Sequence, residues 1–346
     1  MLTTLQSSAS VADHIYWFLI FLFQILNMLS ILTLENLIHP MLALNPFEKL
    51  LFVIQLMSKE AAFKRVVFAG GGCRCVWQAG FWHVAGIPLG LDKAIIGCVS
   101  AGAAMACLAR ADRILEGMAV FKKNFKNNQK NAYFSRLGTP DPVFPQHAIY
   151  RGGLLSVLDE KAMRKINRSP GIRVLIAKPP RSLNAQMATL LGIGTYTLEK
   201  HLLNPMHPTW SRRLGFQPIV VEAGTCTTAD QLVDVILQSS CTPPFVPELF
   251  RNGHPVLDGG LIDNVPVIAV KELQGTMLVL LSRCYSQDRI PAIKGRFYVQ
   301  PSRPPFIKRW DYTNPGGLQN TFDLGCRDAE AFLKKFEDGV LDLSAC

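Results

Sequence analysis

The stretch "IIGCVSAGAA", Ile95 to Ala104, decides the fold expected for this chain. Ser100 stands at the end of an apolar run, and only small residues follow it, which is typical of a strand that turns sharply into a helix. Such a turn exposes the hydroxyl and aims the next backbone N–H, that of Ala101, at the same point. It tolerates only small neighbours such as Gly102. We interpret Ser100 as a nucleophile at this junction; a simple helix N-cap is the alternative.

Short apolar runs and helical stretches alternate on both sides of this junction. The expected strands are 65–70, 93–99, 171–180, 216–224 and 276–283. The expected helices are 76–87, 101–125 with a break near Asp112, 228–240 and 326–339. The alternation predicts an α/β fold with a mainly parallel central sheet, covered by helices on both faces in three layers.

A glycine-rich stretch, "GGGCRC" from Gly70 to Cys75, follows the first expected strand. Three glycines between a strand and a helix leave backbone N–H groups open to a phosphate or an oxyanion. A nucleotide loop is disfavoured, because no G-K-[ST] follows and no ribose-binding acid stands at dinucleotide spacing. Alone, the glycine-rich stretch leaves both a phosphate and an oxyanion open as its ligand.

A third stretch, "LDGGLIDNVP" from Leu257 to Pro266, places Asp258 before Gly259 and Gly260. Alone, it reads as a turn with an Asp cap. It is more informative as the last of three motifs, after the glycine loop and the serine turn.

The order of these motifs resembles the patatin-like phospholipase family over roughly Val66 to Lys271, where "SSCTPPF" (239–245) also falls in the family's order. The resemblance implies a Ser–Asp dyad without histidine, an oxyanion hole, and no metal or cofactor. The residues it implies are the nucleophile Ser100, its partner Asp258, the oxyanion residues Gly70, Gly71, Gly72, Cys73 and Ala101, and the supporting residues Arg74, Cys75, Cys98, Gly102, Gly259 and Gly260.

Two positions depart from the family pattern. Cys75 stands where the loop ends in Gly, and Cys98 stands where the serine motif begins with Gly. The function expected is hydrolysis of an acyl ester of a phospholipid, lysophospholipid or other lipid. The alternative is a catalytically weak or inactive membrane-associated lipid-binding protein. His254 invites a triad interpretation, but the sequence "RNGHP" favours a turn.

Charge is uneven along the chain. Residues 1–58 hold one basic residue, so the remainder carries 35 of the 36 Lys and Arg and 23 of the 26 acids, a balance of +12. The predicted partners are a lipid substrate and an anionic membrane surface; a solvated basic surface is the alternative. The sequence contains no aromatic-basic motif of the kind that binds nucleic acid, so nucleic acid is not a predicted partner.

The N-terminal segment contains twenty residues without charge, Ile15 to Leu34, long enough to cross a bilayer. Basic residues begin only at Lys49, which predicts a single membrane helix with the catalytic domain in the cytoplasm. An amphipathic or buried leader is the alternative. The expected division is an anchor at 1–58, the patatin-like domain at 66–271, and a C-terminal extension at 272–346 that completes the sheet and ends in a helix.

Nine cysteines are scattered from Cys73 to Cys346, an odd number without the spacing of a disulfide framework. Cys73 and Cys75 lack a second Cys/His pair at zinc spacing, so no metal site is expected. Free thiols in a reducing compartment fit this pattern.

Overall fold

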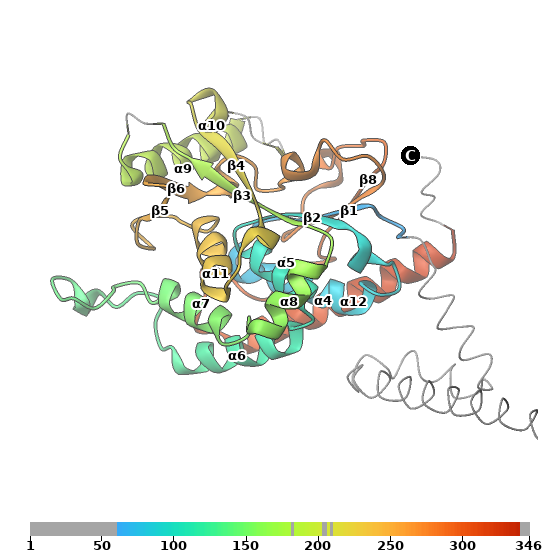
Figure 1. Cartoon of the computed structure of the whole chain (residues 1–346), viewed down its shortest axis with the longest axis horizontal. Helices are drawn as coiled ribbons and strands as arrows, with labels where there is room; N and C mark the ends of the chain where they lie inside the picture. Colours follow the sequence, from blue (N-terminus) through green and yellow to red (C-terminus); the bar gives the residue numbers. More distant parts are fainter. Residues whose placement is uncertain (1–60, 181–182, 203–205, 208–209, 340–346) are drawn as a thin grey trace, which may run out of the picture. The chain divides into compact units, whose positions relative to one another are not determined.

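A computed structural model describes residues 61–180, 183–202, 206–207 and 210–339 (Figure 1). The segment 15–34, predicted above to span a membrane, lies outside these residues. Within them, no helix combines the length and the apolar character that crossing a bilayer requires. This finding contradicts the predicted localisation, a single membrane helix with the catalytic domain in the cytoplasm, and we correct it.

The described residues form a mixed, mostly parallel sheet in the order β5-β6-β3-β2-β1-β7-β8, with β4 also paired to β3. Its strands are β1 (Arg65–Phe68), β2 (Ile95–Val99), β3 (Ile172–Lys178), β4 (Gln217–Glu222), β5 (Leu249–Arg251), β6 (His254–Asp258), β7 (Met277–Leu280) and β8 (Arg296–Val299). The pairs β1–β2, β2–β3, β1–β7 and β7–β8 are parallel, whereas β4 and β6 run antiparallel to β3 and β5 runs antiparallel to β6. The predicted fold class is confirmed, and the antiparallel strands are an addition that the apolar runs did not indicate.

Helices cover the sheet unequally (Figure 1). One face carries α4 (Val76–Ala85), α5 (Ala101–Ala111), α6 (Ile114–Asn127), α7 (Gln146–Leu155), α8 (Glu160–Arg168), α11 (Ala229–Gln238) and α12 (Pro315–Glu337). The other face carries α9 (Ala185–Leu202) and α10 (Trp210–Arg213), with short 3₁₀ turns. The larger apolar core lies on the first face, and two smaller clusters lie on the second. This arrangement leaves the helices after β1 and β2 packed against the larger core.

The register of β3 explains where the site forms. Val99, the last residue of β2, pairs with Leu175, and Asp258, the last residue of β6, pairs with Ile176. Strand β4 occupies the opposite edge of β3 along the same residues. Strands β2 and β6 therefore lie end to end on one edge of β3, and because they run in opposite directions, their C-terminal ends meet.

Two strands and the last helix follow residue 271. Strand β7 pairs with β1 inside the sheet, and β8 pairs with β7. Helix α12 packs closely on α4: a Cβ added at Gly80 would lie 2.1 Å from the Phe322 carbonyl oxygen, and one at Gly325 would lie 2.1 Å from that of Trp77. Glycine at both positions lets the two helix backbones approach each other.

Candidate active site

Ser100 occupies a strained turn between β2 and α5. Its φ is 54° and its ψ is −136°, a conformation that costs energy in a residue other than glycine. Its backbone N–H donates to Ser239 Oγ at 2.7 Å, and that hydroxyl donates to the Leu175 carbonyl at 2.6 Å. Gly102 is required close by, because a Cβ there would lie 2.6 Å from the Ala69 carbonyl oxygen. The turn is thus fixed from both sides.

Asp258 faces the Ser100 hydroxyl. Ser100 Oγ donates to Asp258 Oδ2 at 2.8 Å, and the two residues are only 5% and 2% exposed. The other oxygen, Oδ1, accepts the Gly260 N–H at 2.7 Å. A Cβ at Gly259 would lie 2.2 Å from the Leu175 carbonyl oxygen, so glycine is needed for this approach to β3. The structure therefore brings the two predicted catalytic residues into direct contact.

Burial raises the pKa of the Asp258 carboxyl, because removal from water penalises its charged form. The charge of Arg309, the Gly260 N–H and the Ser100 hydroxyl act in the opposite direction and lower this pKa. A carboxylate with a raised pKa is a stronger base than a free aspartate. The environment thus moves Asp258 toward the basicity that deprotonation of a serine needs.

Hydrogen bonds to its backbone fix the glycine loop at both ends. The Gly70 N–H donates to the Asn264 carbonyl at 2.9 Å, and the Gly70 carbonyl accepts from Asn264 Nδ2 at 2.9 Å and from Ser282 Oγ at 2.6 Å. The Cys73 N–H donates to the Arg309 carbonyl at 3.0 Å. The N–H groups of Gly70 and Cys73, both expected in the oxyanion hole, are therefore already committed.

Three backbone N–H groups of the glycine loop and of the Ser100 turn remain open among the described residues. The described residues provide no hydrogen-bond partner for the N–H groups of Gly71, Gly72 and Ala101. Arg74 stabilises the loop, because its Nε donates to the Gly71 carbonyl at 3.2 Å. Burial, and then the nearby charge of Arg309, lowers the pKa of Arg74. Arg74 thus acts on the shape of the loop.

The two cysteines that depart from the family pattern are fully buried. Cys75 Sγ donates to the Ala69 carbonyl at 3.4 Å, and Cys98 Sγ donates to the Arg173 carbonyl at 3.5 Å. Burial raises the pKa of Cys75 to about 12 and that of Cys98 well above its ordinary value. Both thiols stay protonated at neutral pH, and each satisfies a backbone carbonyl in the core.

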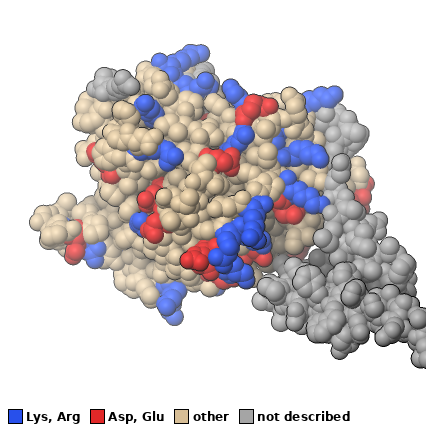
Figure 2. Space-filling model, viewed as in Figure 1, with Lys and Arg blue, Asp and Glu red and all other residues tan. Residues whose placement is uncertain are grey.

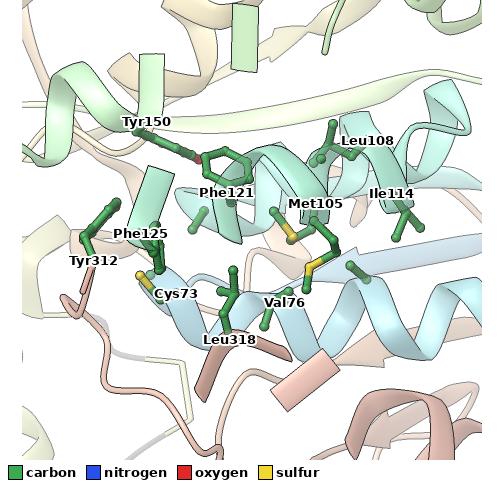
Figure 3. Close-up of a pocket in the computed structure, with 15 residues that line it drawn as sticks. Cys73, Val76, Met105, Leu108, Ile114, Phe121, Phe125, Tyr150, Tyr312 and Leu318 are labelled. Carbon is green, nitrogen blue, oxygen red and sulfur yellow. The ribbon is translucent and has the colours of Figure 1, made fainter. Parts of the chain in front are cut away.

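Two cavities adjoin the Ser100 turn. The first is a narrow apolar cavity of about 50 Å³ between α4, α5, α6 and α12, into which the side chains drawn in Figure 3 point. Its lining includes Val76, Met105, Leu108, Met118, Phe121, Phe125 and Leu318. The second contains Ser100 itself and a more polar lining that includes Gln146, His147, Ser240 and Arg309. Gly72, Ala101, Tyr150 and Tyr312 line both, so two of the open N–H groups lie where the cavities adjoin.

A family model described as "Patatin-like phospholipase" matches residues 66–271 of this sequence. The chain belongs to the patatin-like phospholipase family. The crystal structure of VipD from Legionella pneumophila matches with 12% identity and a TM-score of 0.33, covering 78% of this chain and 67% of that one. No curated protein matches the sequence.

As a patatin-like phospholipase, the chain is placed in a family of lipid acyl hydrolases that act on lipid substrates. Among the described residues, no group of three or more His, Cys, Asp or Glu side chains is arranged to hold a metal ion. His254 is exposed on β6, whereas Asp258 at the end of the same strand is buried. The structure thus brings Ser100 together with Asp258, and it leaves His254 exposed at the other end of the strand, outside this pair.

Sequence reasoning missed four residues at this patatin-like site: Ser239, Asn264, His147 and Arg309. Ser239 and Asn264 fall within the quoted stretches "SSCTPPF" and "LDGGLIDNVP", so the family's order offered a signal for them. His147 lines the polar cavity, and its buried Nε2 has no hydrogen-bond partner in the described part of the chain. Burial, reinforced by the charge of Arg151, lowers the pKa of His147, so its imidazole is mostly neutral at pH 7.

Basic and acidic side chains are interspersed on the face shown in Figure 2. Among the described residues, Arg113 pairs with Asp159 at 3.0 Å, and Lys165 pairs with Asp112 at 3.3 Å. On this face of the patatin-like domain, the positive charge of the sequence is therefore not gathered into one basic patch.

Proposed function

We propose that this protein is a serine lipid acyl hydrolase that cleaves an acyl ester of a phospholipid or lysophospholipid through Ser100 and Asp258. The observation that carries the proposal is the 2.8 Å hydrogen bond from Ser100 Oγ to Asp258 Oδ2, beside three open backbone N–H groups. Nucleophile, base and oxyanion donors are the groups that acyl transfer requires.

In the proposed acylation step, Ser100 Oγ attacks the ester carbonyl carbon while its proton passes to Asp258 Oδ2. The negative charge that develops on the carbonyl oxygen is received by the N–H groups of Gly71, Gly72 and Ala101. The bond to the alcohol then breaks, and the alcohol departs with the proton held by Asp258. An acyl-enzyme on Ser100 remains.

In the second step, water attacks the acyl carbonyl while Asp258 accepts a proton from it. The bond to Ser100 Oγ breaks, the proton returns to Ser100, and the fatty acid is released. Both steps use the same oxyanion donors and the same base, so one site suffices.

The two cavities suggest how the substrate is oriented. The apolar cavity has the lining of an acyl-chain site. The polar cavity beside Ser100 would receive the alcohol side of the ester. We keep an anionic lipid surface as the source of substrate in this proposal, which the +12 balance of residues 59–346 favours.

Two measurements test the proposal. Full-length protein is treated with a fluorophosphonate probe, and it is incubated with a defined panel of lipids whose products are identified by mass. We expect labelling that Ser100→Ala removes, together with release of fatty acid from a phospholipid or lysophospholipid. Lipid binding without labelling or release would favour the inactive lipid-binding alternative, in which Cys75 and Cys98 accompany lost catalysis.

A further inference from the structure

Arg309 reaches the active site from outside the region that the family model covers. It lies between β8 and α12, and its backbone carbonyl accepts the Cys73 N–H at 3.0 Å. Gly72 accommodates it closely: a Cβ there would lie 2.1 Å from the Arg309 carbonyl oxygen. The backbone of Arg309 is therefore fixed against the glycine loop, which fixes the origin of its side chain.

The side chain of Arg309 lines the polar cavity together with Ser100 and His147. Its Nε is buried and has no hydrogen-bond partner in the described part of the chain. Within the same residues, no carboxylate lies within 4 Å of its guanidinium. A partly buried cation is ordinarily paired, because removing a charge from water is unfavourable. Arg309 is thus a cation without a direct partner beside the nucleophile.

The surroundings of Arg309 add a second positive charge. Its charge lowers the pKa of Arg74, so the two guanidinium groups act on each other across the loop. The aromatic ring of Trp310 lies 5.5 Å from the guanidinium carbon and supports it from one side. Asp258 is the nearby opposite charge that Arg309 influences, but Asp258 bonds to Ser100 and Gly260 instead.

We propose that Arg309 binds a phosphate group on the alcohol side of the scissile ester and thereby selects anionic lipids over neutral ones. The inference rests on the proposed function for its placement of the alcohol in the polar cavity. A guanidinium presents a planar set of N–H donors that matches phosphate oxygens, and charge-assisted hydrogen bonds of this kind are strong. The Nε of Arg309, buried without a hydrogen-bond partner among the described residues, shows that the donors of this guanidinium are not all used within the protein.

A kinetic comparison uses two esters that differ only in phosphate: a monoacylglycerol and the lysophosphatidate with the same acyl chain. Arg309→Gln should lower the ratio of kcat/KM for lysophosphatidate to that for monoacylglycerol by roughly tenfold to a hundredfold, mainly through KM. Arg309→Lys should restore part of the ratio, since it keeps the charge. Lys308→Gln, which removes an exposed charge from the same segment, should leave the ratio unchanged.

The competing role of Arg309 is to keep Asp258 ionised. In that case, Arg309→Gln lowers kcat for both esters equally and shifts the acid limb of the pH–rate profile upward, because the charge that lowers the Asp258 pKa is gone. An unchanged ratio with this shift overturns the proposal.

A binding measurement separates this inference from the proposed function. Ser100→Ala protein, which needs no turnover, is titrated by calorimetry with hexyl phosphate, hexanol and inorganic phosphate. Hexyl phosphate should bind tightest, since it has both an alkyl chain and a phosphate, and adding Arg309→Gln should weaken it roughly tenfold without changing hexanol. Equal affinity for hexyl phosphate and hexanol overturns the proposal. Inorganic phosphate binding as tightly as hexyl phosphate does so too, because it indicates a free-phosphate site. If hexyl phosphate binds in an Arg309-dependent way but the native protein hydrolyses no ester, only the proposed hydrolase function is refuted, and phosphate binding by Arg309 stands.

Discussion

The Ser100 hydroxyl donates to Asp258 Oδ2 at 2.8 Å, although 158 residues separate the two in sequence. The contact follows from strand geometry. Strands β2 and β6 approach each other end to end along one edge of β3, so the residue after β2 meets the last residue of β6. The sheet therefore holds the proposed pair, Ser100 and Asp258, at the adjoining ends of two strands.

Ser100→Ala and Asp258→Asn should each reduce ester hydrolysis by roughly 10³-fold or more, and the double variant should be little worse than either single one. Groups that act as one unit lose their contribution together. Steady-state kinetics with a soluble short-chain ester measures this. His254→Ala is the control, because His254 is exposed on the same strand as Asp258. A loss from His254→Ala that equals the loss from Asp258→Asn would contradict the dyad.

Asp258→Asn should raise the melting temperature while it removes activity. Burial raises the pKa of the Asp258 carboxyl, so the folded state holds the proton more tightly than the unfolded state does. The stability that this provides is complete below the ordinary aspartate pKa and is lost as the pH rises through the raised value. An amide carries no such penalty at neutral pH.

The thermal comparison is made by calorimetry at several pH values. The gain of Asp258→Asn over the native protein should be largest at neutral pH and should shrink as the pH falls through the raised pKa of Asp258. Asp141→Asn, an exposed residue, is the control and should change little. A lower melting temperature for Asp258→Asn at neutral pH would show that its hydrogen bonds outweigh the cost of burying its charge.

Ser239→Ala should impair catalysis although Ser239 does not touch substrate in the proposed mechanism. Its hydroxyl links the Ser100 N–H to the Leu175 carbonyl, and without it a buried donor and a buried acceptor lose their partner. We expect a loss of about 1–3 kcal/mol in unfolding free energy and a lower kcat. Ser156→Ala, which removes a hydroxyl bonded to the Gly153 carbonyl, should leave kcat unchanged. Equal kcat for the two variants would mean that the turn at Ser100 does not need this support.

Gly72→Ala should disrupt the oxyanion loop for two reasons. The φ of Gly72 is +59°, and a Cβ would collide with the Arg309 carbonyl. We expect kcat to fall by roughly 10²-fold, as for the loss of an oxyanion donor. Gly138→Ala is the control and should leave kcat unchanged, since Gly138 also has a positive φ, +82°, but has open space around it and lines neither cavity at Ser100. If Gly72→Ala keeps full activity, Gly72 is not part of the oxyanion hole.

Met105→Trp should shorten the acyl chain that the protein accepts. Met105 lines the apolar cavity, and the larger indole ring of tryptophan at this position would fill the cavity. Hydrolysis of long-chain esters should fall by roughly tenfold or more relative to butyrate esters. Met187→Trp, the same change on an exposed residue of α9, should leave the chain-length profile as it is. An unchanged profile for Met105→Trp would place the acyl chain elsewhere.

Local patterns were enough to predict the fold class and to single out Ser100, whereas Asp258 became a candidate through the order of the three motifs and the family resemblance. The break near Asp112 was also predictable: α5 ends at Ala111, and Asp112 has a φ of 58°. These features depend on neighbouring residues, where side-chain size and periodicity carry information.

Long-range features were not predictable in the same way. The antiparallel direction of β6 and the bond from Ser100 to Ser239 depend on register between segments far apart in sequence. Helix α12 begins at Pro315, whereas the sequence predicted a start at 326. The predicted start was too late because Gly316 and Gly317 resemble a loop in sequence. Tight packing on α4 outweighs their poor helix propensity. Arg309 carried no signal, since an arginine before an aromatic residue in a loop is common.

The attachment of Arg309 and α12 to the glycine loop and α4 has a consequence for synthesis. The ribosome makes Ser100 and Asp258 before it makes β7, Arg309 and α12. A nascent chain that has reached residue 271 still lacks β7, which pairs with β1, and the carbonyl that holds the Cys73 N–H. We therefore expect the nascent chain to lack the proposed hydrolase activity while it is on the ribosome. It should gain that activity only when α12 has emerged and packed on α4.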